Sequence, residues 1–317
     1  MDAHEDAEMD PREAGRDGPT PLPPGGSGAP AGDLVTRLGA VAADPARRLR
    51  DAAEPLAVHA IGSADVRVAL AALGLQHFPG YVWSRAACLG QPVAGFVVAA
   101  FAVFEPGFLR AAYRTARATC ARGTLLRVRE EATVRSLDAV LGAEQVDDAI
   151  SLLRRALSAA PWAGRPLFAG LAGMSWPRDS LGQLWRACEL LREHRGDTHV
   201  ASWVSRGLGP VEMNVLTELW LGMPLGRYTR ALGWGDQAVA AAVEHLERRG
   251  LVEAAALSED GRALRCAIEE ATNRGQRPIV DALGADLEPL VAALAVWSAQ
   301  CVEAGTAPAD DGKRAAG

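Results

Sequence analysis

The chain has 317 residues, of which 49% are hydrophobic and 23% are charged, a composition typical of a globular protein of about two domains. Its net charge of −6 at pH 7 and its pI of about 5.6 exclude an overall positive field that attracts nucleic acid or anionic lipid. Its five cysteines occur singly, without a C-x-x-C pair, which excludes a zinc ribbon or disulfide framework and indicates a reducing, cytoplasmic location.

Both ends of the chain have the composition of disordered tails. Residues 1–31 are rich in Glu, Asp, Pro and Gly, and they lack the basic-then-apolar pattern of a signal peptide. Residues 306–317 have a similar composition. The most apolar run, 96–104, follows a stretch that contains two glycines and a proline. We expect a buried helix there, and no membrane span.

Residues 32–208 carry apolar side chains at helical spacing, and no strand alternation of useful length interrupts them. Breaks such as His-Phe-Pro-Gly at 77–80 and Phe-Glu-Pro-Gly at 104–107 separate the predicted helices. We therefore predict an all-helical N-terminal domain.

Within this domain, the stretch 190–200 is unusually polar, because six of its eleven residues carry a charge or an imidazole. Gly196 can take the left-handed conformation that ends a helix, and Asp197 can then cap the next helix. We therefore predict a polar corner between two helices. His194 would lie in the last turn of the first helix and His199 in the first turn of the second, so that the two converge.

Two interpretations of this corner stay open. In the first, its side chains only satisfy helix ends and Asp197 is only a cap. In the second, which we favour because the titratable groups exceed what capping requires, the corner belongs to a ligand pocket. Aromatic and arginine residues elsewhere can line the same pocket. The candidate ligand-binding residues are His77, Tyr81, Trp83, Arg85, Arg165, Trp185, Glu193, His194, Arg195 and His199.

We expect no metal and no cofactor at this corner. The five-residue spacing of His194 and His199 is not the i, i+4 pairing that places two ligands on one helical turn, and Arg195 repels a cation. The chain also has no Gly-rich strand-to-helix turn for a flavin or nicotinamide, and no nucleophile elbow for covalent catalysis.

Residues 209–305 change character, and we predict a C-terminal winged helix-turn-helix domain there. The predicted elements are, in order, a helix (211–221), a short helix (226–232), a turn (233–236), a longer helix (237–249), a strand (250–257), a turn (258–261) and a strand that continues as a helix (262–273). This is the order of a winged helix-turn-helix.

Residues 211–273 resemble the DNA-binding module of MarR-type regulators. The resemblance lies in the phrase Leu-Glu-Arg-Arg-Gly-Leu-Val at 246–252 and in a hairpin turn with Leu257-Ser258 and Gly261. It implies a mainly α fold, in which an N-terminal helical domain precedes a C-terminal MarR-like winged helix-turn-helix with a small β-hairpin wing.

Residues 77–305 as a whole resemble an uncharacterised bacterial helix-turn-helix family. Two segments carry this resemblance, Gly-Arg-Pro-Leu at 164–167 and Leu-Arg-Glu-His-Arg-Gly-Asp at 191–197. The chain departs from the family pattern at Thr198, where Gly is expected, and at Asn273, where Asp is expected. The resemblance implies no particular activity, and the departures indicate a specialised member.

DNA binding has weak support in the residues themselves. Phosphate contacts dominate DNA affinity, and base reading needs polar side chains at the start of the recognition helix, which here offers a single Gln. Residues 201–290 carry 9 Arg against 13 Asp and Glu, and the predicted wing tip at 258–262 carries two acids and one Arg. The candidate DNA-binding residues are Gln237, Arg227, Arg230 and Arg262, with Arg265 as a further arginine on the same face.

We predict a homodimeric, cytoplasmic protein that binds a hydrophobic or aromatic small molecule and acts as a ligand-responsive transcriptional regulator, with DNA as its second partner. The alternative is an enzyme on a regulator-like scaffold. In that version His194 or His199 is a general acid or base, Asp197 or Glu193 orients it, and an arginine holds an anionic part of the substrate. A third interpretation is a scaffold or partner-binding protein in which the corner is only structural.

Overall fold

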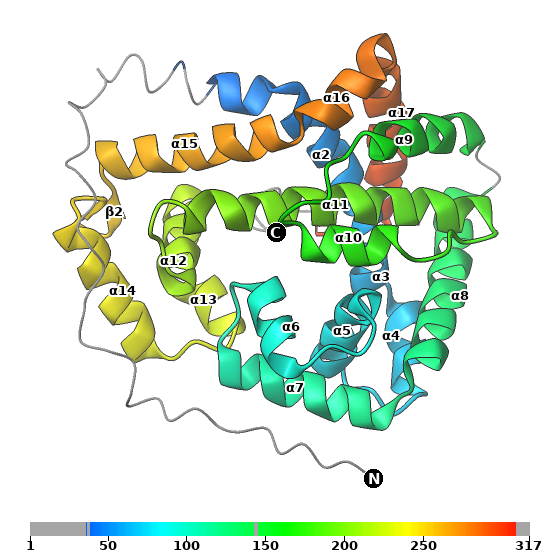
Figure 1. The fold of residues 1–317 in the computed structure, drawn as a ribbon, viewed down its shortest axis with the longest axis horizontal. Coiled ribbons are helices and arrows are strands. Elements are labelled where there is room, and N and C mark those ends of the chain that lie inside the picture. Colours follow the sequence, from blue (N-terminus) through cyan, green and yellow to red (C-terminus); the bar gives the residue numbers. More distant parts are fainter. Residues whose placement is uncertain (1–35, 37–38, 143–144, 309–317) are drawn as a thin grey trace.

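The computed structural model describes residue 36 and residues 39–142 and 145–308. These residues form a mainly α fold with one two-stranded sheet, as predicted (Figure 1). The predicted tail 1–31 lies outside the described residues, and so do residues 309–317 of the predicted C-terminal tail 306–317. At the end of the described chain, Ala307 is buried and the Thr306 hydroxyl donates to the Cys301 carbonyl (2.9 Å).

The first part of the described chain is helical, as its periodicity predicts. Its elements are α2 (Pro45–Ala57), α3 (His59–Gly62), α4 (Ala64–Ala71), α5 (His77–Ala86), the 3-10 helix η1 (Ala87–Leu89), α6 (Ala94–Phe101), α7 (Pro106–Thr119), α8 (Arg122–Leu141), α9 (Asp147–Ser158), α10 (Pro166–Ala172) and α11 (Ser180–Val204). Acidic side chains begin three of these helices, because Asp44, Glu105 and Asp179 accept hydrogen bonds from backbone N–H groups in the first turns of α2, α7 and α11.

Helix α11 is the longest described helix and runs through the middle of the molecule (Figure 1). It packs against α2, α9, α10 and α15 (Glu259–Gly275), and most of its residues are buried. The predicted polar corner is therefore wrong, because the backbone stays helical through Gly196 and Asp197. A glycine inside a helix costs about 1 kcal/mol relative to alanine. Packing on several sides of a 25-residue helix outweighs that local signal.

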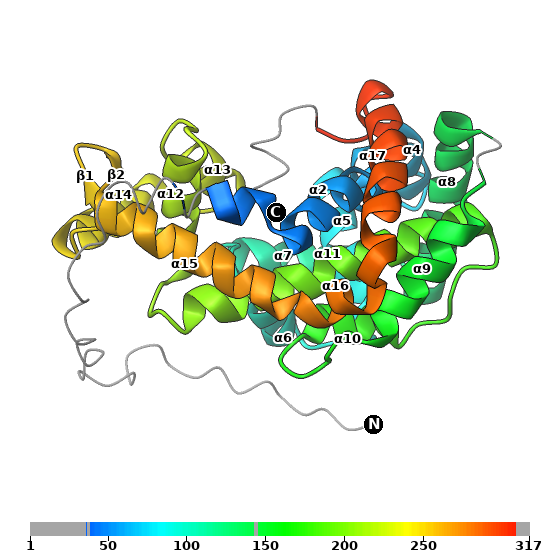
Figure 2. The same cartoon turned by 90° about the horizontal axis from the view of Figure 1, so that it is seen from above.

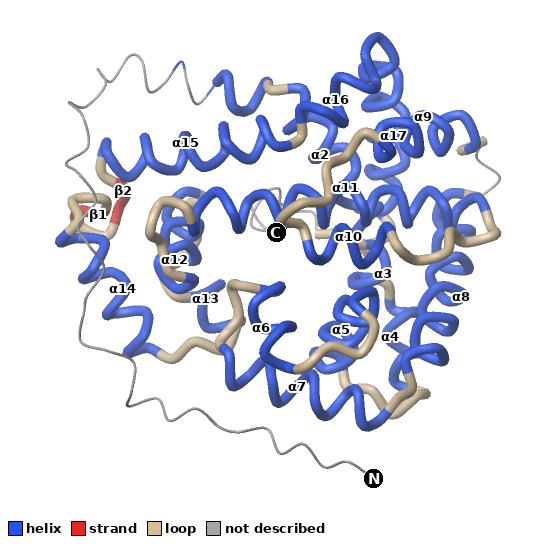
Figure 3. The backbone as a smooth tube through the Cα atoms, viewed as in Figure 1, coloured by secondary structure: helices blue, strands red, loops and turns tan. Residues whose placement is uncertain are grey.

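The last part of the described chain begins with three helices in the predicted order. These are α12 (Pro210–Trp220), α13 (Arg227–Ala231) and α14 (Asp236–Arg248), followed by the strands β1 (Val252–Glu253) and β2 (Ala256–Leu257). Figure 3 shows the small hairpin at one end of the molecule, and Figure 2 shows α15 running away from it alongside α11. Gly275 permits the close approach of α15 to α11, because a Cβ there would lie 2.3 Å from Thr198 Cγ2.

The hairpin is shorter and lies earlier in the chain than predicted. Strands β1 and β2 pair antiparallel, and Ala254 and Ala255 form the turn between them with φ of 47° and 58°. Alanine is unusual at two such positions, which glycine and asparagine favour, so the sequence does not indicate this turn. The predicted turn at 258–261 is wrong: Ser258 caps α15 there, because its hydroxyl accepts a hydrogen bond from Gly261 N–H (3.0 Å).

Three apolar cores connect these elements. The first joins α2, α9 and α11 to the C-terminal helices α16 (Arg277–Leu283) and α17 (Leu287–Glu303), which the 3-10 helix η2 (Gly284–Asp286) connects. The second joins α5, α6 and α7, and the third joins the end of α11 to α12, α14, α15 and the hairpin. Helix α17 packs mainly against α2. The domain boundaries at 32–208 and 209–305 stay a prediction.

The apolar run at 96–104 forms most of α6 and the turn that follows. Val97 and Phe101 of this helix are buried in the second core. No single described helix is long and apolar enough to cross a membrane. The pair formed by α5–η1 and α6 is long and apolar enough when the two are taken together, by length and composition alone, but the pair is bent by 97°.

Candidate ligand-binding cavity

A cavity of about 420 Å³ is lined by residues of the second and third cores and by polar side chains of α2, α11 and α15. Residues of α2, α5, α6, α11, α12, α13 and α15 line it. Its volume falls within the range of about 300–1,000 Å³ that is usual for small-molecule sites. The cavity can therefore hold a small organic ligand.

One wall of the cavity is aromatic. Its members are Phe78, Tyr81, Phe101, Phe104, Trp203 and Tyr228. Three of them surround Phe104, whose ring centroid lies 5.7 Å from that of Phe78, 6.3 Å from that of Tyr81 and 6.1 Å from that of Phe101. Such a wall favours an apolar or aromatic ligand.

A second group of lining residues, called the charged wall, carries charges, and it meets the aromatic wall where the Arg85 guanidinium lies 4.6 Å from the centre of the Phe101 ring. Among the described residues that line the cavity, its cations are Arg47, Arg50, Arg85, Arg192, Arg195 and Arg265, and its carboxyl groups belong to Glu54, Asp197 and Glu269. Arginine pairs well with carboxylate and phosphate groups because its guanidinium presents several fixed donors. The cavity thus combines an apolar surface with a basic one.

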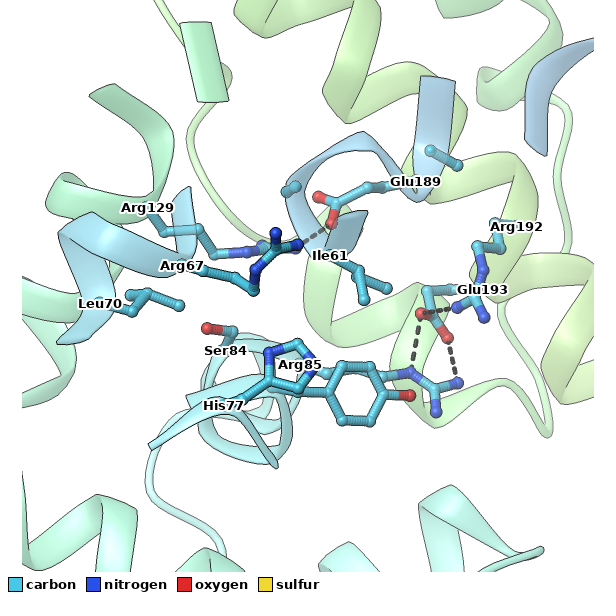
Figure 4. Close-up of a pocket in the computed structure, with 13 residues that line it drawn as sticks. Ile61, Arg67, Leu70, His77, Ser84, Arg85, Arg129, Glu189, Arg192 and Glu193 are labelled. Atoms are coloured by element: carbon cyan, nitrogen blue, oxygen red, sulfur yellow. Dashed lines mark hydrogen bonds and ion pairs between the residues drawn. The ribbon is translucent and has the colours of Figure 1, made fainter. Parts of the chain in front are cut away.

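The charged wall includes an ion-pair network between α5 and α11 (Figure 4). Arg85 donates from Nε to Glu193 Oε1 (2.9 Å) and from Nη2 to Glu193 Oε2 (2.8 Å), and Arg192 also donates to Oε1 (3.1 Å). Burial favours the neutral form of Glu193, but the two arginines outweigh it and hold the pKa of this carboxyl below its usual range. Arg192 reaches Glu54 as well (3.1 Å), which ties α2 into the network.

A second, much smaller pocket of about 40 Å³ adjoins the main cavity. The two share five lining residues, Ile61, His77, Tyr81, Arg85 and Arg192. Figure 4 shows the Arg129–Glu189 ion pair at its far side and Ser84 below it. This pocket has room for little more than a water molecule, and through the shared residues it extends the main cavity.

Helix α15 supplies the other charged cluster. Glu269 accepts hydrogen bonds from Arg195 Nη2 (3.0 Å) and pairs with Arg265 Nη2 (3.1 Å) and Arg47 Nη1 (3.7 Å). Burial opposes its ionisation, but the surrounding cations lower the pKa of Glu269 to about 2. Arg265 is 2% exposed, so the prediction that it shares a DNA-facing surface with the other arginines is wrong. It faces inward because α15 packs this side against α11.

Asp197 lies on α11 and lines the cavity. Its Oδ2 accepts a hydrogen bond from the N–H of Phe168 (3.0 Å), in the first turn of α10. Asp197 therefore does cap a helix, but the helix is α10 and not the one predicted to follow it. Burial raises the pKa of Asp197 to about 7, an effect that the backbone donors only partly offset.

The two histidines of α11 do not converge. Side chains five residues apart on one helix point roughly 140° away from each other. His199 lines the cavity, with Nδ1 3.3 Å from Thr272 Oγ1. His194 is fully buried on another side, where its ring packs edge-on against Phe168 and Nδ1 lies 2.8 Å from Gln276 Oε1. Burial lowers the pKa of both imidazoles to about 4.

The remaining predicted ligand residues lie outside the lining of the main cavity. Trp83 is buried in the second core and donates to the Cys120 carbonyl (2.9 Å), and Trp185 is buried beneath Arg129. Arg165 donates to Thr198 Oγ1 (3.0 Å). The structure thus brings together at the cavity His77, Tyr81, Arg85, Arg195, Asp197 and His199, with Glu193 behind them. Their role in ligand binding stays a prediction.

Several lining residues have only faint signals in the sequence. Arg47 and Arg50 look like the wet side of an amphipathic helix, and Tyr228 lies in a short helix between turns. Arg265 and Glu269 have the i, i+4 spacing of an ordinary ion pair on an exposed helix face, so the sequence does not indicate their burial.

Gly196 leaves open space at the cavity wall, because a Cβ at this position would meet no atom within 4 Å. Replacing Gly196 by Ala should raise the free energy of unfolding by about 0.5–1 kcal/mol. The matched control is Gly182→Ala in the same helix, whose Cβ would lie 2.8 Å from Pro177 Cβ and should destabilise the protein. Urea unfolding followed by circular dichroism measures both. A loss of stability in Gly196→Ala comparable to that in Gly182→Ala would contradict the assignment of open space at Gly196.

The predicted DNA-binding residues lie on the outside of the third core. Gln237, Arg227, Arg230 and Arg262 are all exposed. Arg230 pairs with Asp236 at the start of α14. The exposed face of α14 otherwise carries alanines, glutamates, a histidine and an arginine, and the last two pair with glutamates. This face offers few free cations to a phosphate backbone.

A family model described as a helix-turn-helix family matches residues 46–308. The matched region runs from α2 to the end of the described chain, so it includes every helix that lines the cavity and the three helices α12–α14. No curated protein and no solved structure matches the chain.

Proposed function

The chain belongs to this helix-turn-helix family, and on that premise we propose that it is a transcriptional regulator whose DNA binding responds to a small molecule held in the cavity. One observation carries the proposal: the helix-turn-helix elements themselves form part of the cavity wall. Met213, Asn214 and Thr217 of α12 line it, as do Tyr228 of α13 and Leu232 directly after it. A bound hydrophobic or aromatic molecule contacts the DNA-binding elements directly.

The segment between α6 and α7 supports this coupling. The Val103 carbonyl accepts hydrogen bonds from Asn214 Nδ2 (3.1 Å) and from Trp234 Nε1 (2.9 Å), and Glu105 N–H donates to the Leu232 carbonyl (2.9 Å). Ligand contacts with the neighbouring aromatic wall therefore reach α12 and α13 through direct bonds. A ligand that prefers one arrangement of these helices shifts the DNA-binding equilibrium by that difference in affinity.

We also propose a MarR-like winged helix-turn-helix, a homodimer and a cytoplasmic location. The order of α12, α13, α14 and the hairpin supports a MarR-like winged helix-turn-helix, with α14 as the recognition helix. A homodimer would let two recognition helices reach two half-sites of an operator. A cytoplasmic location agrees with five free cysteines in the described residues and with contact to DNA.

DNA binding is tested with the purified full chain and its own upstream DNA, by fluorescence anisotropy at 50 and 200 mM salt. We expect saturable binding that weakens with salt. The slope of the logarithm of the affinity against the logarithm of the salt concentration should fall by about one, or one phosphate contact, when Arg227 is replaced by Ala. The control is Arg178→Ala, an equally exposed arginine that precedes α11 and lies far from α12–α14. Absence of sequence-selective binding at 50 mM salt would refute the regulator.

An enzyme is the second candidate, because Asp197 is a cavity carboxyl whose pKa burial raises to about 7. A group with this pKa exchanges protons readily near neutral pH. Arg85 and Arg195 line the same cavity and would hold an anionic part of a substrate. In this version Asp197, and not His194, is the acid or base. A folded chain with an intact cavity that binds no DNA would favour this function over that of a regulator.

A further inference from the structure

Arg265 is a buried arginine with unsatisfied donors. It is 2% exposed and lines the cavity from α15. Its Nη2 pairs with Glu269, whereas its Nε and Nη1 have no hydrogen-bond partner among the described residues. Its guanidinium lies 5.3 Å from the centre of the Trp220 ring, but a contact with a ring face leaves the in-plane N–H groups without acceptors. Buried charged donors ordinarily have acceptors, so this site lacks one.

Positive charge exceeds negative charge around Arg265. Glu269 is shared by Arg265, Arg195 (3.0 Å) and Arg47 (3.7 Å), so one carboxylate faces three guanidinium groups. Arg47 has a further partner in Asp51, which pairs with it from the exposed side (2.9 Å). Even so, the cations of this cluster outnumber its carboxylates. An anion that enters the cavity would balance them, and it would accept the free N–H groups once the Arg265 side chain turns toward it, because both nitrogen atoms are covered in this arrangement.

We propose that this end of the cavity binds the acidic group of the ligand, with Arg265 as the donor to its oxygens and with Arg195, whose Nη atoms donate to Asn273 (2.8 Å) and Glu269 (3.0 Å), adding positive charge beside it. The shared chemistry is an oxyanion, either a carboxylate or a phosphate, since guanidinium groups recognise both. The aromatic wall holds the apolar remainder of the molecule. The ligand is thus an organic acid with an apolar body. The inference deepens the proposed function by naming the class of its effector, and it rests on that proposal only for the ligand's regulatory role.

The test uses three probes that carry a phenyl ring on a four-carbon chain: 4-phenylbutyrate, 4-phenylbutyl phosphate and the neutral 4-phenylbutyramide. Isothermal titration calorimetry of the full chain without DNA gives the affinity for each. The wild-type protein should bind at least one of the two anions tenfold or more tightly than the amide, and the tighter anion identifies the head group. Arg265→Met should lower that anion's affinity at least tenfold and leave the amide unchanged. Arg178→Met, at an exposed arginine outside the cavity, should bind like the wild type.

Three outcomes overturn the proposal: equal binding of anions and amide by the wild-type chain, no binding of either anion, or an unchanged anion affinity in a folded Arg265→Met protein. If that variant does not fold, Arg265→Gln serves in its place, and the wild-type comparison stands without either. DNA takes no part in the titration. If the protein binds the anion but no DNA, the proposed regulatory function is refuted and the anion site is not. If it binds DNA but no anion, only the anion site is refuted.

Discussion

Replacement of Glu269 by Gln is expected to lower the free energy of unfolding by about 3–5 kcal/mol. Glu269 is 5% exposed and holds the guanidinium groups of Arg47, Arg195 and Arg265 within 3.7 Å or less. Glutamine keeps the size of the side chain but removes its charge. Three guanidinium groups would then stay close together with no carboxylate between them, and breaking a buried pair from one side costs far more than the pair contributes intact.

Urea unfolding at pH 7, followed by tryptophan fluorescence, measures this change. The matched control is Glu131→Gln, which removes a carboxylate from the exposed pair with Arg127 on α8 and should change stability by less than about 0.5 kcal/mol. The double variant Glu269→Gln with Arg265→Met should recover part of the loss, because it removes one of the cations left without a partner. A cost for Glu269→Gln no larger than that of the control would show that the cluster is already hydrated.

Local patterns were enough to predict the helical class and the order of helices around the hairpin. They failed at Gly196, because a glycine followed by an aspartate has the same local appearance at a helix end and inside a buried helix. The choice between the two depends on what packs against α11, and those partners lie far away in sequence. At Ala254 and Ala255 the opposite happened: the turn is there, and the residues do not indicate it.

The candidate site was predictable in its residue types more than in its geometry. Arg85 and Glu193 were both selected from the sequence, but their bidentate pairing joins positions 108 residues apart and depends on how α5 crosses α11. His194 was selected because it lies in a polar stretch, yet the helix turns it away from the cavity. Arg265 was assigned to the surface because nothing local shows which side of α15 is covered.

Acid should destabilise the protein steeply between pH 6.5 and pH 4, through the two buried imidazoles of His59 and His194 and the half-buried one of His199. Burial lowers the pKa of His59, His194 and His199 to about 4, from an ordinary value of 6.5. Their contribution to stability is therefore complete above pH 6.5 and is lost as the pH falls to about 4, by at most roughly 3 kcal/mol for each. Asp197 acts in the opposite direction. Its raised pKa lowers the stability of the folded protein above pH 7, and this cost disappears as the pH falls below 7. The stability regained offsets roughly the loss from one histidine.

The variant His194→Gln separates this contribution from the others. His194 is fully buried, with Phe168 against its ring and Gln276 as its hydrogen-bond partner, so glutamine should cost stability at pH 7 through lost packing. The cost should shrink by up to about 3 kcal/mol at pH 4.5, because the variant has no imidazole to protonate on unfolding. Leu171→Val, in the neighbouring α10, carries no titratable group, and its cost should be the same at both pH values. A His194→Gln cost that stays constant with pH would mean that this imidazole is already protonated, or hydrated, in the folded protein, and the acid lability would then have to arise at His59 and His199.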